Sequence, residues 1–357
     1  MDYSLGQRLR ELPGPILLTG HTGFKGTWMT YLLEYLQVPV IGFSLEAEKN
    51  SLFERTGRRG LIPEAFTDIR DFEALRRFMD VYKPSVIIHM AAQPLVIKSY
   101  ESPRETFDIN IMGTANVLDL AFESDFVKKI IVVTSDKVYL NTNSGKRFKE
   151  SDPLEGKDPY SASKVGAESV VAAWQQIANV NLGPTVISVR AGNVVGGGDW
   201  ATDRLIPDII RAVLNSSVLS IRSPGSVRPW QHVLDPLFGY LLGTISLGAS
   251  EDYKSFNFGP NGSNVTVREV VEISKRHFGE KLVVVYEEPQ KDVTSNVESL
   301  TLNLDSMKSS SLLNFSPKWD QQEAIERTFL WWEKFLSKKS TPEELIIAEI
   351  KDYFSEN

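Results

Sequence analysis

A glycine-rich turn near the start of the chain constrains its fold more than any other feature. Gly20, Gly23 and Gly26 are spaced three residues apart within TGHTGFKG. The turn follows a short apolar strand expected at 15–18 and opens an amphipathic helix expected at 24–36. Backbone N–H groups at such a turn can bind the pyrophosphate of a dinucleotide. A glycine triplet alone is weak evidence, but the flanking strand and helix favour cofactor binding over a purely structural turn.

Apolar runs alternate with helical patterns through about residue 195. Further strands are expected at 38–45, 85–92, 129–136 and 185–195, and helices at about 104–124 and 159–178. Two of these runs, SVIIHMAA and KIIVVTSD, are nearly continuously apolar, which is typical of strands covered on both faces. The alternation predicts the α/β class, with a Rossmann-type, doubly wound parallel sheet.

The pattern changes after about residue 196, where GGGDW is interpreted as a flexible break. Beyond it we expect helices at 206–215, 233–247 and 266–278, strands at 218–222 and 282–286, and a last amphipathic helix from near Asp320. Thr266 and Glu269 form a capping box. We therefore predict a dinucleotide-binding domain at 1–195 with a return segment near 230–260. Residues 196–357 mainly form a smaller mixed α/β lobe for the substrate.

The composition excludes several classes of protein. The chain has 357 residues, 42% of them apolar, and no cysteine, which removes disulfides, thiolate nucleophiles and cysteine-based zinc sites. The net charge of -7 argues against a general nucleic-acid binder, and the four histidines show no metal-ligand spacing. The start of the chain lacks a signal-peptide pattern, and no run is long enough to span a bilayer. We expect a cytoplasmic protein without metal, membrane or nucleic-acid partners.

Tyr160 and Lys164 in YSASK lie four residues apart, on one face of a predicted helix. A phenol beside a fixed ammonium has a lowered pKa and can move protons near neutral pH. The pair alone could be part of a solvated helix face. Asp158 and Pro159 start the helix, and a strand ending in Thr134 precedes it, so redox chemistry at a carbinol carbon is favoured.

Polar residues Ser135, Asp136 and Lys137 follow the strand expected at 129–136. They come to the carboxyl edge of the sheet, where ligands bind in open α/β folds. An adjacent carboxyl and amine could act as acid and base. Without the rest of the chain, an exposed ion pair would be the more probable interpretation.

The second strand lacks the acidic end residue that usually holds the adenosine ribose. Ser44 stands near that end and Glu46 follows, and we see no arginine for a 2′-phosphate. We infer NAD rather than NADP, and expect loosened cofactor affinity. Asp68 and Ile69 look placed for the adenine, with a helix cap before Phe72 as an equally weighted alternative for Asp68.

Two arginines of the second half, Arg204 and Arg228, could bind a diphosphate, since guanidinium forks match phosphate oxygens. Each alone is more often a surface residue.

Long stretches of the sequence resemble the extended short-chain dehydrogenase/reductase superfamily and, within it, the CDP-glucose 4,6-dehydratase branch. They are GHTGFKGTW (20–28), HMAAQPLVIKSY (89–100), NIMGTANVLDLA (110–121), TSDKVY (134–139), DPYSASK (158–164), RAGNVVGGGDWATDRLIPD (190–208) and RPWQHVLDP (228–236). Val138 and Leu140 depart mildly from the branch pattern, where cysteine and glutamate are common.

The resemblance implies conversion of CDP-glucose to CDP-4-dehydro-6-deoxyglucose and water, with NAD regenerated. Tyr160 would take the 4-hydroxyl proton, Ser135 or Thr134 would bind the 4-oxygen, and Asp136 would protonate the departing 6-hydroxyl. Lys137 would be the base at C5, where the related dTDP-glucose enzymes have glutamate. Lysine needs a lowered pKa for this role.

The resemblance also implies further binding residues. Those for NAD are Gly20, Thr22, Gly23, Phe24, Gly26, Ser44, Asp68, Ile69, Ala91, Ala92, Gln93, Asn110, Thr134, Tyr160 and Lys164. Those for the nucleotide sugar are Gln93, Ser99, Ser135, Asn193, Arg204, Leu205 and Arg228. The helices at 104–124 and 159–178 would form a four-helix interface in a homodimer or homotetramer. As sheet-covering helices they would be present in a monomer too.

Other functions remain open from the sequence. A 4-epimerase, or a dehydratase for another nucleotide, would share the glycine turn and the Tyr160–Lys164 pair. Epimerization needs no acid and base at C6 and C5, so Asp136 and Lys137 favour dehydration. A non-catalytic dinucleotide sensor is a remote alternative, since it would be expected to lose Tyr160 or Lys164.

Overall fold

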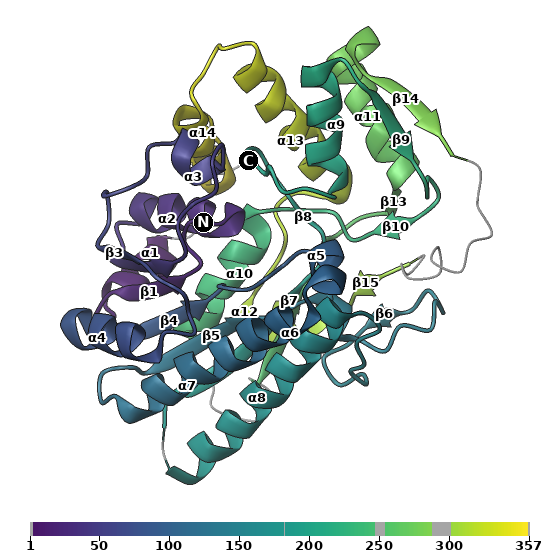
Figure 1. Ribbon diagram of the computed structural model, residues 1–357. Helices are drawn as coiled ribbons and strands as arrows, with labels where there is room; N and C mark the ends of the chain where they lie inside the picture. The colour runs from purple at the N-terminus through teal and green to yellow at the C-terminus, as the bar shows by residue number, and fades with distance from the viewer. Residues whose placement is uncertain (1–2, 182, 247–253, 288–300, 356–357) are drawn as a thin grey trace.

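The computed structural model describes residues 3–181, 183–246, 254–287 and 301–355. Its central strands are β1 (Ile16–Thr19), β2 (Val40–Ser44), β3 (Glu64–Phe66), β4 (Val86–His89), β5 (Lys129–Val133), β7 (Thr185–Ala191) and β12 (Ser255–Phe258). They form one parallel sheet in the order β12-β7-β5-β4-β1-β2-β3 (Figure 1). The predicted Rossmann-type sheet is therefore confirmed. Its last strand, β12, returns from the second half of the chain.

Helices cover both faces of this sheet. One face carries α1 (Tyr3–Arg10), α2 (Phe24–Tyr35) and α10 (Leu234–Ile245), and the other carries α4 (Phe72–Tyr82), α7 (Gly113–Glu123) and α8 (Pro159–Asn181). In β1, Ile16 and Leu18 pack into the first cluster and Leu17 into the second. Successive side chains of a strand point to opposite faces, so continuous apolar strands need both layers.

The helix predicted at 104–124 is interrupted. It consists of α6 (Pro103–Phe107), the π-helical turn η1 (Asp108–Met112) and α7, and α5 (Val96–Glu101) precedes it. A π-turn inserts one residue into the helical repeat and often occurs at functional sites. Here it contains Asn110, whose side chain binds two other segments described below.

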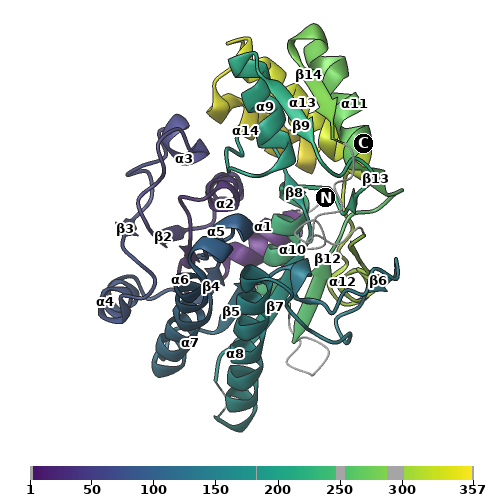
Figure 2. The same cartoon turned by 45° about the vertical axis from the view of Figure 1, so that its right-hand side comes forward.

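The second half of the chain forms a smaller group of elements above the carboxyl edge of the sheet (Figures 1 and 2). Its main elements are α9 (Leu205–Asn215), α11 (Val267–Phe278), α13 (Gln321–Leu336) and the parallel strands β9 (Val218–Ile221) and β14 (Val283–Tyr286). Shorter strands are β8 (Val194–Val195), β10 (Val227–Arg228), β11 (Gln231–His232) and β13 (Val265–Thr266). The capping box of Thr266 and Glu269 is present. The domain boundary at 195 stays a prediction.

Small elements complete the described chain. They are α3 (Leu52–Arg55), the 3-10 turns η2 (Asp136–Val138) and η4 (Gly279–Lys281), β6 (Arg147–Phe148), β15 (Asn303–Leu304) and α12 (Met307–Leu313). The helix from Asp320 is not the last one, because α14 (Pro342–Phe354) follows and packs against α2. Neither α14 nor α1 was expected from the sequence.

The glycine stretch at 196–198 is not a flexible break. All three glycines are buried, and the carbonyl oxygen of Gly197 accepts a hydrogen bond of 3.1 Å from the indole of Trp28. A Cβ on Gly197 would lie 2.0 Å from the ring of Trp331. The glycines therefore permit close packing between α2 and α13, which sequence composition alone cannot distinguish from mobility.

Candidate active site

The glycine turn joins β1 to α2 in a backbone geometry that only glycine fits. Gly20 has a φ of +76°, and a Cβ there would lie 2.8 Å from the backbone nitrogen of Ala91. A Cβ on Gly26 would lie 2.1 Å from the carbonyl oxygen of Gly20. Gly23 caps α2 and is exposed, and its neighbour Phe24 is half-buried. The first turn of α2 has no side-chain cap, and the binding of a pyrophosphate there stays a prediction.

An arginine lies near the end of β2, where the sequence analysis expected none. The hydroxyls of Thr22 and Ser44 lie 2.8 Å apart, and Thr22 also donates to a backbone carbonyl. Glu46 forms an ion pair of 2.5 Å with Arg59, which lies over the ring of Phe66. An arginine therefore does adjoin this strand end, brought there by the fold. The absence of arginine cannot be used as an argument for NAD.

Asp68 lies beyond β3 and is held by Arg70, which donates to both of its carboxylate oxygens at 3.0 and 2.7 Å. These hydrogen bonds lower the pKa of Asp68. The alternative assignment of Asp68 as a helix cap is wrong, since Asp71 caps α4 by accepting from Ala74 N at 2.9 Å. Ile69 is buried in the core beside α7. The adenine roles of Asp68 and Ile69 stay predictions.

Tyr160 and Lys164 lie in the first two turns of α8, next to the end of β5. Lys164 Nζ donates to the carbonyl oxygen of Val133 at 3.1 Å, and burial lowers the pKa of Lys164 to about 8. Burial raises the pKa of Tyr160 to about 12, although a hydrogen bond with Ser135 opposes the increase. The expected lowering of the Tyr160 pKa is therefore wrong. The electrostatic cost of a buried phenolate exceeds the attraction of neighbouring cations.

Asp136 begins the turn after β5 and is 3% exposed. Its Oδ1 accepts from the hydroxyl of Ser135 at 3.1 Å, and Oδ2 has no hydrogen-bond partner among the described residues. Burial raises the pKa of Asp136 to about 6, against the opposing charges of Lys137 and Arg228. A carboxyl group with this pKa can hold a proton near neutral pH and donate it.

Lys137 shares the turn η2 with Asp136 and is half-buried, whereas Asp136 is buried. Its backbone nitrogen donates to the hydroxyl of Ser135 at 3.2 Å. The two residues thus project from one turn at the sheet edge. The role of Lys137 as a base stays a prediction.

Lys25, in the first turn of α2, is a site residue that the sequence analysis did not select. Its Nζ donates to the hydroxyl of Tyr240 in α10 at 3.3 Å. Burial, with the charges of Lys164 and Arg204, lowers the pKa of Lys25 to about 7. Side chains in a first helical turn point toward the helix start, so a lysine within the glycine turn was the available signal.

Three of the predicted ligand residues form hydrogen bonds that hold the site together. Asn110 in η1 binds both backbone groups of Gln93 and donates to the hydroxyl of Ser163 at 2.8 Å. The side chain of Gln93 bonds Leu95 and Thr106. Ser99 accepts from the backbone nitrogen of Tyr160 at 3.1 Å. These contacts position α8, and ligand contacts by Gln93, Ser99 and Asn110 stay predictions.

The remaining predicted residues lie around the same edge. Arg204 forms an ion pair of 3.0 Å with Asp199 and acts electrostatically on Tyr160, and Leu205 begins α9. Arg228 is buried and acts electrostatically on Asp136. The carbonyl oxygen of Asn193 accepts from Gln231 N at 3.0 Å. At the end of β4, Ala91 N donates to Thr19 at 3.1 Å, and the half-buried Ala92 follows.

Among the described parts of the chain, no group of three or more potential ligands is placed to hold a metal ion. Within the same residues, no helix is both long and apolar enough to cross a membrane.

Comparison with known proteins identifies the family. The model described as GDP-mannose 4,6 dehydratase matches residues 17–328. The chain belongs to this family. A CDP-glucose 4,6-dehydratase from Salmonella typhimurium is 38% identical over 95% of this chain and 96% of its own length. The family match agrees with the short-chain dehydrogenase/reductase resemblance of the sequence.

Solved structures of the dehydratase family and its epimerase relatives share the fold. A UDP-glucose 4-epimerase from Thermotoga maritima aligns with a TM-score of 0.78 at 23% identity, over 90% of this chain and 99% of that one. A dTDP-glucose 4,6-dehydratase from Bacillus anthracis, solved in complex with NAD, aligns with a TM-score of 0.74 at 24% identity, over 90% and 97%. At these identities the likeness supports the fold alone.

Proposed function

We propose that the protein is an NAD-dependent hydro-lyase that converts CDP-glucose to CDP-4-dehydro-6-deoxyglucose and water. The observation that carries the proposal is the pairing of two buried proton-transfer groups at one sheet edge. Tyr160 is hydrogen-bonded to Ser135, and Ser135 also contacts Asp136. An oxidation at C4 and an elimination at C6 need two such groups close together.

The first step removes a proton from the sugar 4-hydroxyl. Tyr160 acts as the base, so its phenol must be ionised when the reaction starts. Ser135 and Arg204 favour the phenolate, and the hydroxyl of Ser135 can also bind the oxygen at C4. Lys164, fixed to the end of β5, lies one helical turn from Tyr160.

NAD fits the glycine turn, since Gly20 and Gly26 allow the turn to pack closely against its own backbone and the end of β4, while the exposed Gly23 leaves the first turn of α2 open. Bound NAD supplies the reversible two-electron acceptor that oxidation and its later reversal require. Gly23, Phe24 and the first turn of α2 would hold its pyrophosphate, and Lys164 its nicotinamide ribose. Thr22, Ser44 and Thr134 are the further polar groups proposed to contact it.

The second step is elimination of water across C5 and C6. The 4-ketone acidifies the C5 proton, which Lys137 would remove, and Asp136 would protonate the leaving 6-hydroxyl. The raised pKa of Asp136 and its open Oδ2 suit this acid role. Return to C6 of the two electrons taken from C4, with a proton added back at C5, then yields the 4-keto-6-deoxy sugar.

The choice of CDP-glucose rests on the Salmonella relative, which is 38% identical over nearly the full length of both chains. Arg204, Arg228 and Asn193 would bind the diphosphate, and Leu205 would lie near the base. A product of this kind belongs to deoxysugar biosynthesis, including that of lipopolysaccharide O-antigen.

The test is a panel of CDP-, dTDP-, GDP- and UDP-glucose, each deuterated at C4 and incubated with NAD. A 4,6-dehydratase moves the deuterium to C6 of a deoxy sugar, which NMR detects. A 4-epimerase returns a C4 epimer that retains oxygen at C6, and a non-catalytic sensor returns the substrate unchanged. Conversion of a nucleotide other than CDP would correct the substrate while keeping the reaction.

The outer surface of α6, η1 and α8 would form the dimer interface. It exposes large apolar side chains, with Phe107 37%, Met112 51% and Ile177 39% exposed. Exposed apolar residues gathered on neighbouring helices are typical of an interface. Light scattering should give the mass of a dimer or tetramer, and Met112→Asp should lower it. A monomeric native protein would contradict the interface.

The cytoplasm would be the site of action. The absence of cysteine suits a reducing compartment, although it does not require one. Fractionation of the native host, followed by immunodetection, would test this localisation.

A further inference from the structure

The loop from Thr134 to Tyr139 contains the proposed catalytic residues Ser135, Asp136 and Lys137. It follows β5 at the carboxyl edge of the sheet, where the substrate is proposed to bind. Its two ends are hydrogen-bonded to the two halves of a single buried ion pair, Glu168 and Arg190. Neither half was selected from the sequence, because the partners lie 22 residues apart on different elements.

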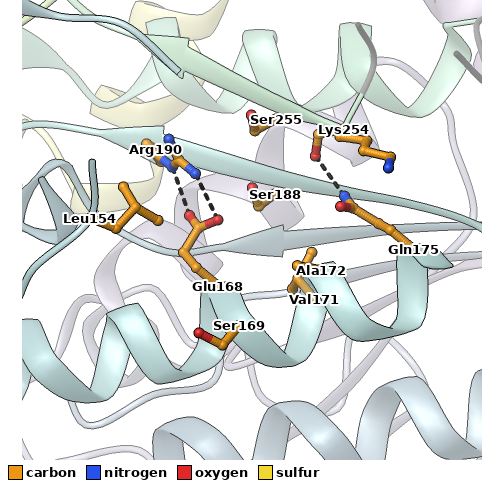
Figure 3. A pocket seen from close by; sticks show the side chains of 10 residues that line it. All are labelled: Leu154, Glu168, Ser169, Val171, Ala172, Gln175, Ser188, Arg190, Lys254 and Ser255. Carbon is orange, nitrogen blue, oxygen red and sulfur yellow. Dashed lines mark hydrogen bonds and ion pairs between the residues drawn. The ribbon is translucent and has the colours of Figure 1, made fainter. Parts of the chain in front are cut away.

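The ion pair joins α8 to β7 (Figure 3). Arg190 Nε donates to Glu168 Oε1 at 2.7 Å, and Arg190 Nη2 donates to Oε2 at 2.8 Å. The side chains are 4% and 6% exposed. Two parallel hydrogen bonds fix both the separation and the orientation of the groups.

Thr134 holds the first end of the loop to this pair. Its hydroxyl donates to Glu168 Oε1 at 2.5 Å, and its backbone nitrogen donates to Val189 O at 2.9 Å. The hydroxyl is thus directed at α8, and the next residue, Ser135, faces Tyr160.

Tyr139 holds the second end of the loop. Its hydroxyl accepts from Arg190 Nη1 at 2.8 Å and donates to Asn257 Oδ1 at 2.7 Å. The ring stacks on Phe148 with centroids 5.0 Å apart. Between these two anchors, the backbone hydrogen bonds within the turn η2 are long, at 3.4 Å, and Val138 O also accepts from Glu155 N at 2.9 Å.

Glu168 also lies on the helix that carries the proton-transfer pair. It follows Lys164 by one turn and Tyr160 by two, so all three share a helix face. Its charge acts on Lys164. A single carboxylate is therefore connected both to the loop of Asp136 and to the helix of Tyr160.

Packing alone does not fix this pair. A cavity of about 210 Å³ borders Glu168 and Arg190, and Leu154, Gln175 and Lys254 are among its other lining residues (Figure 3). With open space on one side, the hydrogen bonds determine where the carboxylate and guanidinium lie. A buried ion pair is also weak evidence for stability, because desolvation offsets much of the attraction.

We propose that Glu168 and Arg190 are positioning residues that set the separation between Asp136 and Tyr160. The expected effect on kcat rests on the proposed function, whereas the positioning of the loop does not. Displacement of the loop would misalign acid and substrate, which lowers kcat more than it changes KM.

The test compares Tyr139→Phe with Tyr353→Phe. Each variant removes one buried tyrosine hydroxyl, but Tyr353 binds Asp235 beneath the other face of the sheet. We expect Y139F to lower kcat by about 3- to 100-fold, with KM within about twofold. Y353F should leave both unchanged. Amide hydrogen exchange in residues 134–139 should accelerate in Y139F and not in Y353F.

Glu168→Gln is the second variant, and it should accelerate loop exchange and lower kcat as well. Unchanged loop exchange in both Y139F and folded E168Q would overturn the proposal, as would an unchanged kcat in both. Exchange measurements need no substrate. If the native protein converts no nucleotide sugar, the proposed function fails, while loop exchange still decides whether the pair positions the loop.

Discussion

Two buried aspartates have similar titration behaviour and different surroundings. Asp136 is 3% exposed and Asp235 is 0% exposed, and burial raises the pKa of each to about 6. In both, Oδ2 has no hydrogen-bond partner among the residues that the structure describes. By these measures the two sites are equivalent.

Their positions in the fold separate them. Asp136 stands on a turn at the carboxyl edge of the sheet, in contact with Ser135. Asp235 lies in the first turn of α10, where Oδ1 accepts from Lys318 N at 2.8 Å and from the hydroxyl of Tyr353 at 3.0 Å. The carboxyl group of Asp235 is thus held by α14 and by the loop between α12 and α13.

The comparison shows that a shifted pKa does not by itself mark a catalytic group. Structural carboxyl groups in a core acquire the same shift by desolvation. What distinguishes Asp136 is the neighbouring set of proton-transfer groups and its location where parallel sheets bind ligands.

The largest expected effect separates the two aspartates by activity. Asp136→Asn should lower kcat for CDP-glucose by about 10²- to 10⁴-fold, because the amide cannot donate an acidic proton. Asp235→Asn should keep kcat within about twofold of the native value, since the amide oxygen can still accept both hydrogen bonds. Steady-state kinetics at saturating substrate and NAD measure this. Equal losses in the two variants would remove the distinction.

The next effect concerns the pH dependence of stability and should be common to both aspartates. A carboxyl group whose pKa is raised from 3.8 to about 6 stabilises the folded protein fully below the lower value. That stabilisation is lost as the pH rises through about 6, by about 3 kcal/mol per group at most. Each Asn variant should therefore show a weaker fall in the free energy of unfolding between pH 4 and pH 7, measured by urea titration. An unchanged pH dependence in D235N would show that Asp235 is not protonated in the fold.

A smaller effect is expected from a substitution at Gly192, which lies beside Asp136. A Cβ on Gly192 would lie 3.1 Å from Asp136 Oδ2 and 2.3 Å from Pro229. Gly192→Ala should lower kcat about tenfold and the free energy of unfolding by about 1–3 kcal/mol. Gly225→Ala is the matched control, because nothing lies within 4 Å of its added Cβ. Native kinetics in G192A would mean that the space beside Oδ2 is not needed.

The smallest effect concerns the enclosed aspartate. Tyr353→Phe removes one hydrogen bond to Asp235 and should lower the free energy of unfolding by about 1 kcal/mol. Its kcat should remain native, since Asp235 has no proposed part in catalysis. Urea unfolding and steady-state assays on one preparation give both values. A fall in kcat without loss of stability would connect α14 to the active site.

Much of the fold was predictable because its signals are local. The continuous apolar runs located the central strands, and the spacing of Gly20, Gly23 and Gly26 located the turn before α2. The capping box of Thr341 and Glu344, with Pro342 at the first helical position, is also a local signal for α14, which the prediction missed. The start of α14 was therefore predictable. By contrast, α1 carries no acidic residue in its first turn to mark its start.

Other features had no local signal. A run of three glycines is equally compatible with a mobile linker and with the buried contact of Gly197 with Trp331. Only the packing in the folded protein distinguishes the two. Arg59 reaches Glu46 from 13 residues away, and its place at the end of β2 depends on the path of the chain between them. Pairs of residues that are distant in the sequence leave no local pattern from which they could be predicted.

The sequence by itself determined the parallel sheet, the dinucleotide turn and the shared helix face of Tyr160 and Lys164. Each follows from residue periodicity or from backbone limits that act over a few residues. Only the tertiary structure decided that Asp136 can hold a proton near neutral pH, that Lys25 reaches the site, and that Glu168 and Arg190 connect the loop to α8. Those properties depend on burial, which distant segments create when they exclude water from a charge.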